Sequence, residues 1–479
     1  MPLLDPALWQ DGPTLTAGTA PVVEPATGRT LATVTLAGPA DVAEAAVRAE
    51  AAQREWAGAA YTERAAVLRR AGDLFAVHAA ELRDWLVRES GAVPGKAEFE
   101  LRVAAQECYE AAALASRPAG QVLAGEAPRL SWTRRVPAGV VGVIAPFNAP
   151  LILSIRSVAP ALALGNSVLL KPDRRTAVCG GLALAAVFAA AGLPAGLLHV
   201  LPGGAGTGSA VVSDPRVRVV SFTGATATGR QVAELAGRHL KRAHLELGGN
   251  SAYLVLADAD VEAAVNQAAW GSFFHQGQIC MTAGRHLVHA SLYDEYVERL
   301  AAKAESLAVG DPYTEQVHLG PVIDRGQLDR IHGLVEASAE RGAKLMAGGT
   351  HRDLFYRPTV LAGVVDDTPA YAEEVFGPVA PVRSFVTEDE AVALAAAGPY
   401  GLSLGILTAD TARGLELADR IPTGIVHVND QTVNDEAVAP FGGVGASGTG
   451  ARFGGEANLD AFTELRWTTA RRTPAAYPF

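Results

Sequence analysis

The sequence predicts an α/β protein with a doubly wound parallel-sheet domain, a second α/β domain and a small β arm. Short apolar runs alternate with helical runs from residue 139 to 247, and a second block of the same kind runs from 252 to 428. Buried strands that alternate with helices are typical of a parallel sheet with right-handed crossovers, the doubly wound arrangement. Two extended, mixed polar stretches, RLSWTRRVP (129–137) and LRWTTARR (465–472), fit neither block and could form a protruding arm.

The elements follow one another along the chain. Three helices precede the first strand, at 41–56, 62–89 and 94–114. Thr62 and Glu63 suit a helix start, and Gly91 suits a stop. The first block predicts strands at 139–145, 167–171, 197–201, 217–222 and 243–247, with helices at 151–164, 176–191 and 228–239. The second block predicts strands at 252–256, 286–289 and 425–428, with helices at 261–274 and 292–307.

The composition is that of a globular chain without a basic surface. The chain has 479 residues, of which 49% are hydrophobic and 19% charged, so it exceeds one ordinary core. A net charge of -11 disfavours nucleic acid and anionic membranes as partners. The apolar stretches are too short to span a bilayer, and the N-terminal MPLLDPALWQDGPT lacks the basic flank and apolar run of a secretory signal.

The cysteines are few and far apart. Cys108, Cys179 and Cys280 are odd in number, which disfavours a disulfide scaffold and favours a reducing, cytoplasmic setting. No two of them have metal-ligand spacing and no HExxH motif occurs, so no metal site is expected. Cys280 lies in FFHQGQICMTAG (273–284), and at this point it is either a buried core residue or a nucleophile.

Glycine-rich turns follow two of the predicted strands. GAGTGS (204–209) nearly spells a dinucleotide fingerprint but lacks the final glycine, so an ordinary loop is the alternative. Gly224 and Gly229 flank the start of the helix after strand 217–222, where backbone N–H groups favour a phosphate. A helix merely capped by Thr226 is the alternative there.

Two polar residues lie at strand ends. Glu246 stands between Leu245 and Leu247, where a carboxylate is costly unless paired or protonated, so its pKa is expected to rise toward the range of a general base. A solvent-facing glutamate is the alternative. Asn148 is flanked by prolines in APFNAP at the carboxyl edge of the sheet, where doubly wound folds bind ligands. Its amide could stabilise an oxyanion, or it could simply form the turn.

Taken together and in this order, these motifs resemble the aldehyde dehydrogenase superfamily. The matching motifs are LLKP (169–172), FTG (222–224), LELGGN (245–250), GQIC (277–280), EEVFGP (373–378) and PFGG (440–443). The resemblance covers about residues 20–470. FFHQGQICMTAGRH and VNDQTVNDEAVAPFGGVGASGTGARFGG are similar to the aromatic branch, which includes benzaldehyde, vanillin and salicylaldehyde dehydrogenases.

The resemblance implies a catalytic role for three residues. Cys280 would be the nucleophile, whose thiolate attacks the aldehyde carbon to give a thiohemiacetal. The side-chain amide of Asn148 and the backbone N–H of Cys280 would hold the oxyanion. After hydride transfer, water activated by Glu246 would hydrolyse the thioester to the acid.

The resemblance also implies NAD or NADP as the cofactor. Lys171 matches the residue that contacts the adenosine ribose, Gly224 and Gly229 match the glycines near the pyrophosphate, and Glu374 matches the residue that binds the nicotinamide ribose. Phe147 stands where a tryptophan is usual, and the ring is retained.

Arg174 departs from the family pattern. NAD-preferring relatives often carry a glutamate three residues after the lysine, and that glutamate repels the 2′-phosphate of NADP. With Arg174 in this position the repulsion is absent, and a guanidinium can pair with a phosphate. The sequence therefore predicts use of both cofactors; an Arg174 that points into solvent is the alternative.

Two residues are expected to shape the aldehyde tunnel. Arg156 follows Asn148 by eight residues on the next helix, and Phe441 lies in PFGG. An aromatic wall suits an aryl group, and an arginine can bond ring hydroxyl or methoxy oxygens. A surface ion pair is the alternative for Arg156.

The resemblance gives the domains their expected roles. A dinucleotide-binding domain comprises 1–128 and 138–246, a catalytic domain comprises 247–440, and a small β oligomerisation arm comprises 129–137 and 465–479. Such an arm adds strands to a partner subunit, which implies a homodimer or homotetramer. The alternatives are an aliphatic or semialdehyde dehydrogenase, CoA-acylating chemistry, which a base at residue 246 disfavours, and a non-catalytic protein that retains the fold.

Overall fold

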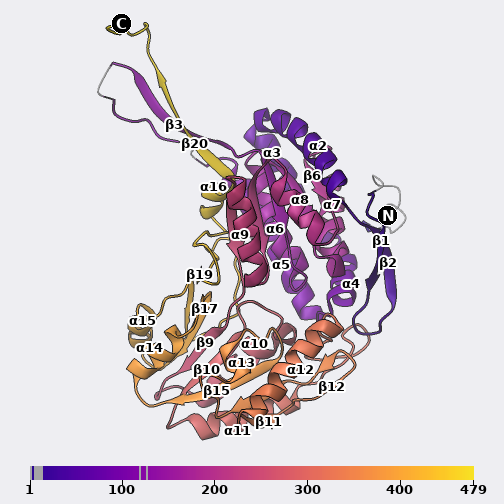
Figure 1. Ribbon diagram of the computed structural model, residues 1–479, viewed down its shortest axis with the longest axis vertical. Coiled ribbons are helices and arrows are strands. Elements are labelled where there is room, and N and C mark those ends of the chain that lie inside the picture. The colour runs from indigo at the N-terminus through magenta and orange to yellow at the C-terminus, as the bar shows by residue number, and fades with distance from the viewer. Residues whose placement is uncertain (1–2, 5–14, 118–119, 126–127) are drawn as a thin grey trace.

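The structure, a computed structural model, describes residues 3–4, 15–117, 120–125 and 128–479. Figure 1 shows two α/β bodies and a two-stranded arm that projects from the first of them. The remaining residues, 1–2, 5–14, 118–119 and 126–127, all belong to the segment 1–128 that is assigned to the first domain. Most of the N-terminal stretch MPLLDPALWQDGPT therefore lies outside the described residues.

The first body is built on a parallel sheet with the strand order β6-β5-β4-β7-β8. Its strands are β4 (Val140–Ile144), β5 (Ser167–Lys171), β6 (Leu198–Val200), β7 (Val217–Thr223) and β8 (Arg242–Glu246). Its helices are α2 (Pro39–Gly58), α3 (Tyr61–Val77), α4 (Ala79–Ser90), α5 (Pro94–Leu114), α6 (Pro150–Ala163), α7 (Ala183–Ala190), α8 (Ala205–Ser213) and α9 (Thr226–Arg238). All five strands lie where the alternating pattern predicts them.

Helices cover both faces of this sheet because the side chains of each strand alternate. Val141 and Val143 of β4 pack into a core that includes α3, α5 and α6. Val140 and Ile144 pack into a second core that includes α2 and α8. The doubly wound arrangement is therefore confirmed for this body.

Two helix predictions are corrected. The segment 62–89 is not one helix, because the chain leaves helical geometry at His78 (φ -101, ψ 18); α4 then ends at Gly91 in the left-handed conformation, as expected. The segment 176–191 begins as a 3-10 turn (Arg174–Thr176) and a π-helical turn (Val178–Leu182) before α7. Gly181 lies in that wide turn, where an added Cβ would be 2.6 Å from Val200 Cγ1.

The second body has a mixed sheet with the order β11-β14-β15-β10-β9-β17-β18. Its strands are β9 (Ser251–Val255), β10 (Ala283–His289), β11 (Lys344–Ala347), β14 (Thr359–Ala362), β15 (Val379–Phe385), β17 (Ser403–Leu407) and β18 (Ile425–Val428). The edge strand β11 is antiparallel to β14, whereas the other pairs are parallel. Its helices are α10 (Val261–Phe273), α11 (Tyr293–Ser306), α12 (Arg325–Glu340), α13 (Pro369–Ala372), α14 (Glu388–Ala396) and α15 (Thr411–Ala418).

The two extended stretches pair with each other as the projecting arm of Figure 1. The strand β3 (Leu130–Pro137) is antiparallel to β20 (Thr463–Ala470), and β20 begins two residues before the predicted stretch. Leu130, Leu465 and Trp467 are exposed on this arm. Smaller elements complete the chain: β1 (Thr19–Val23), β2 (Thr30–Thr35), a 3-10 turn (Phe274–Gly277), β12 (His351–Arg352), β13 (Phe355–Tyr356), β16 (Tyr400–Gly401), β19 (Val444–Gly445) and α16 (Ala457–Phe462). No helix in the described part of the chain is long and apolar enough to cross a membrane.

Candidate active site

A cavity of about 860 Å³ opens at the carboxyl ends of β4, β5 and β7, where it meets residues of the second body. Six of the predicted site residues line it: Phe147, Asn148, Lys171, Gly224, Cys280 and Glu374. The first body therefore supplies the edge of the sheet that doubly wound folds use for ligands, and the second supplies Cys280 and Glu374. Residues far apart in the sequence meet in one cavity.

The glycine-rich turns contribute unequally to the cavity. Gly224 lines it, and so does Gly204 of the weaker GAGTGS motif, which forms the start of α8 rather than an ordinary loop. Gly229 does not line it; a Cβ there would lie 2.2 Å from Leu247 Cδ2, so Gly229 is a packing glycine. The helix α9 has no side-chain cap, and Thr226 Oγ1 instead donates to the Ala446 carbonyl at 3.0 Å.

Glu246 ends β8 and is buried, with 2% of its surface exposed. Neither carboxylate oxygen has a hydrogen-bond partner among the described residues. Burial raises the pKa of Glu246 well above its usual value, although the charges of Arg156 and Arg452 lower it. The expectation of a raised pKa is confirmed, and the solvent-facing alternative is wrong. Glu246 itself is not part of the lining of the cavity.

Cys280 lies on a loop with an uncommon backbone. His275, Gln276 and Gly277, which precede it, all have positive φ, at 49°, 56° and 64°. A non-glycine residue in this region is strained by about 1–3 kcal/mol, and it stays there only when the surrounding structure imposes the conformation. Here Gln276 Nε2 donates to the carbonyls of Gly91 at 2.9 Å and Pro321 at 2.7 Å. These tertiary bonds hold the loop and thereby fix the position of Cys280.

The thiol of Cys280 is half-buried. Burial, together with the charges of Glu374 and Glu246, raises its pKa to about 12, although the charge of Arg156 lowers it. Glu374 itself has a pKa raised to about 7 by burial, although it accepts a hydrogen bond from the Gly249 N–H at 3.0 Å. Burial therefore favours the protonated form of the thiol in this structure.

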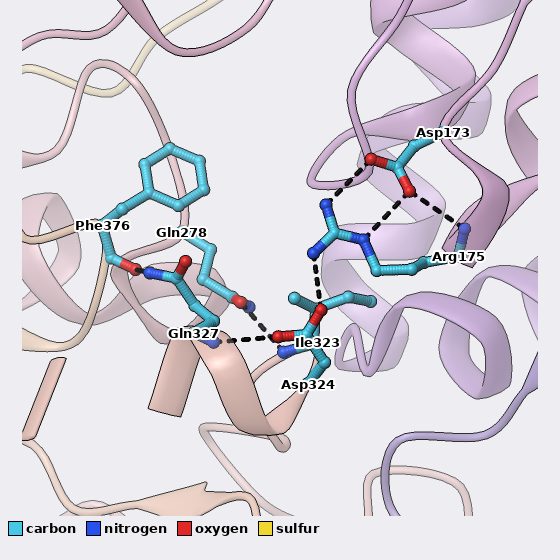
Figure 2. Close-up of polar contacts among 7 residues, drawn as sticks. All are labelled: Asp173, Arg175, Gln278, Ile323, Asp324, Gln327 and Phe376. Carbon is cyan, nitrogen blue, oxygen red and sulfur yellow. Dashed lines mark hydrogen bonds and ion pairs between the residues drawn. The ribbon is translucent and has the colours of Figure 1, made fainter. Parts of the chain in front are cut away.

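Arg175, and not Arg174, lines the cavity. Figure 2 shows its guanidinium between Asp173 and Asp324. Arg175 donates to both oxygens of Asp173 at 2.9 and 2.8 Å and to Asp324 Oδ2 at 2.7 Å, and its guanidinium carbon lies 4.2 Å from the centre of the Phe147 ring. Arg174 is exposed and outside the cavity lining, and its contact with the cofactor stays a prediction. Burial alone would raise the pKa of Asp173, but the bonds from Arg175 outweigh burial and lower it.

The start of α12 connects Arg175 to the loop that carries Cys280 (Figure 2). Asp324 caps α12 by accepting from the Gln327 N–H at 2.9 Å. The neighbouring Ile323 N–H donates to Gln278 Oε1 at 3.0 Å, two residues before Cys280. Gln327 Nε2 in turn donates to the Phe376 carbonyl at 2.8 Å. One helix start therefore contacts Arg175, the Cys280 loop and the loop that carries Glu374.

Arg156 and Phe441 lie together, but outside the lining of this cavity. Arg156 is fully buried and forms an ion pair with Asp435, so the surface-ion-pair alternative is wrong. Its guanidinium carbon is 4.4 Å from the centre of the Phe441 ring. Its Nε and Nη1 have no partner among the described residues. Phe441 belongs to a small apolar cluster against which Cys280 packs.

Some residues of the site carry no role in the sequence prediction. Asp435, Arg175 and Gln276 are among them, as are Lys96 and Glu100 on α5, which contact the segment around Asn148. The one local signal for the last two is their spacing: a lysine and a glutamate four residues apart on a helix that is otherwise largely buried.

Comparison with known proteins places the chain in a family. The model of the aldehyde dehydrogenase family matches residues 10–468. The chain is 71% identical to a vanillin dehydrogenase of an Amycolatopsis species and 49% identical to an NAD(+) benzaldehyde dehydrogenase of Pseudomonas putida, each over 463 residues, which are 96% of this chain and 95% of the relative. A salicylaldehyde dehydrogenase from Pseudomonas putida G7, solved in complex with salicylaldehyde, matches with a TM-score of 0.93 and 36% identity over 96% of both chains.

The structural match confirms the predicted α/β fold class. The vanillin, benzaldehyde and salicylaldehyde dehydrogenases among the relatives confirm the predicted resemblance to the aromatic branch. They also show that the protein is an oxidoreductase that acts on aldehydes. The chain belongs to the aldehyde dehydrogenase family.

Proposed function

We propose that this enzyme oxidises aromatic aldehydes to carboxylic acids with a nicotinamide cofactor. The observation that supports the substrate class is Arg156, whose two unpaired, buried N–H donors lie beside the Phe441 ring, next to the apolar cluster that contacts Cys280. An aryl group can pack on such a ring, and a ring oxygen can accept from such donors. The relatives named above for vanillin, benzaldehyde and salicylaldehyde support the same proposal.

The cavity fits a dinucleotide. It offers an apolar wall at Phe147 and Phe376, the helix start after Gly224 for a phosphate, and Lys171 and Glu374 as polar groups. When bound, the nicotinamide supplies the acceptor for the hydride. Cys280 lines the same cavity, which is consistent with this assignment.

Cys280, Asn148 and Glu246 each have a separate role in the proposed reaction. The thiol proton of Cys280 passes to water, and the sulfur adds to the carbonyl carbon, which gives a thiohemiacetal. The amide of Asn148 and the N–H of Cys280 donate to the oxygen that becomes negative. After oxidation, the carbon is held as a thioester on Cys280. Glu246 then takes a proton from water, whose oxygen displaces the sulfur and releases the acid.

The substrate proposal predicts an order of rates. Vanillin and benzaldehyde are expected to have a higher kcat/KM than hexanal or acetaldehyde. Arg156→Lys keeps a cation against Asp435 but removes the guanidinium donors, so it should lower the ratio of kcat/KM for vanillin to that for benzaldehyde about tenfold, the cost of one charged hydrogen bond. Steady-state rates with the four aldehydes measure both effects.

The opposite order, with hexanal ahead of the aromatic aldehydes, would refute the aromatic assignment and leave the family unchanged. An unaltered vanillin-to-benzaldehyde ratio in Arg156→Lys would show that Arg156 does not contact the ring substituent. Phe441→Leu is the companion variant, which should lower the rates with both aromatic aldehydes and spare hexanal.

We further propose that Asp173 makes NAD the preferred cofactor. Asp173 lines the cavity two residues after Lys171, and its carboxylate repels a 2′-phosphate. Arg174→Glu is expected to change the ratio of kcat/KM for NAD to that for NADP by less than about threefold, because Arg174 lies outside the lining. Asp173→Asn should lower that ratio by about tenfold, because it removes a like charge and releases Arg175.

Asp324→Asn is the matched control for this prediction. It removes the other carboxylate that pairs with Arg175, but Asp324 is not part of the cavity lining. If Arg174→Glu raises the NAD preference tenfold or more while Asp173→Asn does not alter it, Arg174 and not Asp173 selects the cofactor.

We infer that the protein forms a homodimer or homotetramer through its arm. The exposed Leu130, Leu465 and Trp467 lie on a two-stranded sheet. Its β20 edge pairs with no further strand among the described residues, and a partner strand would cover that edge. A cytoplasmic setting is inferred from three free cysteines.

A further inference from the structure

A buried ion pair on α5 lies directly behind Asn148. The side chains of Lys96 and Glu100 stand one helical turn apart and are 3% and 0% exposed. Lys96 Nζ contacts Glu100 Oε1 and also donates to the backbone carbonyl of Asn148 at 2.6 Å. The pair therefore reaches from α5 to the residue expected to hold the oxyanion.

Glu100 holds the other side of the same segment. Its Oε2 accepts from the Leu151 N–H at 3.1 Å, in the first turn of α6. The helix α6 has no side-chain cap of its own at Ala149, so Glu100 supplies the acceptor from another helix. One ion pair therefore contacts both ends of the segment 148–151: Lys96 donates to the carbonyl of Asn148, and Glu100 accepts from the N–H of Leu151.

Stability alone is a weak explanation for this arrangement. Taking two charges out of water costs more than their attraction usually returns, so apolar residues of similar volume would serve α5 at least as well. The pair does provide fixed geometry. Its hydrogen bonds hold the backbone at the Asn148 carbonyl and at the Leu151 N–H. An oxyanion donor must be placed to within about 0.5 Å to act.

We propose that Lys96 and Glu100 are positioning residues that aim the side-chain amide of Asn148 at the oxyanion. The proposal rests on the proposed function, in which that amide binds the oxyanion. Neither residue touches the substrate; both act through the backbone of residues 148–151.

A double-mutant cycle tests this role. The variant Lys96→Met/Glu100→Gln leaves no unpaired buried charge and keeps an acceptor for the Leu151 N–H, but removes the donor to Asn148. We expect kcat/KM for benzaldehyde to fall at least tenfold, with the Kd for NAD within twofold of wild type. Asn148→Ala alone should lower the rate about 10²–10³-fold. Added to Asn148→Ala, the pair of changes should cost less than twofold more.

Glu89→Gln is the matched control. Glu89 is also a buried carboxylate that accepts from backbone N–H groups, those of Val178 and Cys179 at 2.9 and 2.7 Å, but neither of these groups belongs to the segment 148–151. It is expected to lower the unfolding temperature and to leave kcat with saturating NAD within twofold of wild type.

Each outcome decides between the proposals. Two results overturn the positioning role. One is that Lys96→Met/Glu100→Gln lowers kcat/KM tenfold even when Asn148 is already alanine. The other is that Lys96→Met/Glu100→Gln, with Asn148 present, has a kcat/KM within twofold of wild type. Wild-type activity in Asn148→Ala overturns the proposed mechanism instead. If circular dichroism shows that Lys96→Met/Glu100→Gln does not fold, the same cycle with Glu100→Gln alone decides, and additivity there overturns the role.

Discussion

Replacing Cys280 by alanine is expected to abolish aldehyde oxidation without unfolding the protein. The sulfur is the proposed nucleophile, and its removal should lower kcat by more than about 10⁴-fold, as loss of a covalent catalyst does. The side chain is half-buried, so its loss leaves the core clusters of both bodies in place. Absorbance of the reduced cofactor measures the rate, and thermal unfolding measures the fold.

Cys108→Ala is the matched control for this variant. Cys108 is fully buried on α5 and packs in the core of the first body. It should lose some stability, as removal of a buried side chain does, and keep its activity. Turnover by Cys280→Ala within tenfold of the wild-type rate would contradict the covalent mechanism.

The sequence predicts best those features that depend on local pattern. Glu246 stands between two leucines at a strand end, and that pattern predicts its burial and its raised pKa because an apolar strand end has no water to solvate the carboxylate. The five strands of the first sheet follow from apolar runs alone. The placement of Asn148 in a turn at the carboxyl edge follows from the prolines that flank it.

Features that depend on direction or on distant partners could not be predicted. Arg174 and Arg175 are adjacent cations, and only the 3-10 turn decides that the second faces Asp173 and Phe147. Arg156 finds its counter-ion 279 positions away at Asp435. A single sequence does not show how such segments lie relative to one another. The contacts of Arg175 and of Arg156 could therefore not be predicted before the fold was known.

The backbone strain at His275 and Gln276, just before Cys280, also depends on residues that are distant in the sequence. Glycine at 277 signals a left-handed residue, but His275 and Gln276 carry no such signal, because their positive φ angles are imposed by tertiary contacts. The two hydrogen bonds from Gln276 to Gly91 and Pro321 stabilise that backbone from outside the loop. Reactive loops are therefore where prediction from local propensity is weakest.

Glu246→Gln is expected to separate the two halves of the reaction. The first turnover should still release a burst of reduced cofactor, because Cys280 and Asn148 are intact. Steady turnover should then fall about 10²–10⁴-fold, the usual contribution of a general base, because hydrolysis of the thioester becomes slow without Glu246. Rapid mixing with benzaldehyde resolves the burst from the steady phase.

The pH dependence of this second phase distinguishes a base from a mere cavity wall. Burial raises the pKa of Glu246, and a base works only when deprotonated, so wild-type kcat should fall as the pH is lowered through that raised pKa. The acidic limb should vanish in Glu246→Gln, which has no proton to lose, and should persist in Glu89→Gln, whose carboxylate lies outside the site. A variant that shows neither burst nor turnover would assign Glu246 to the first half of the reaction, as the group that takes the proton of Cys280.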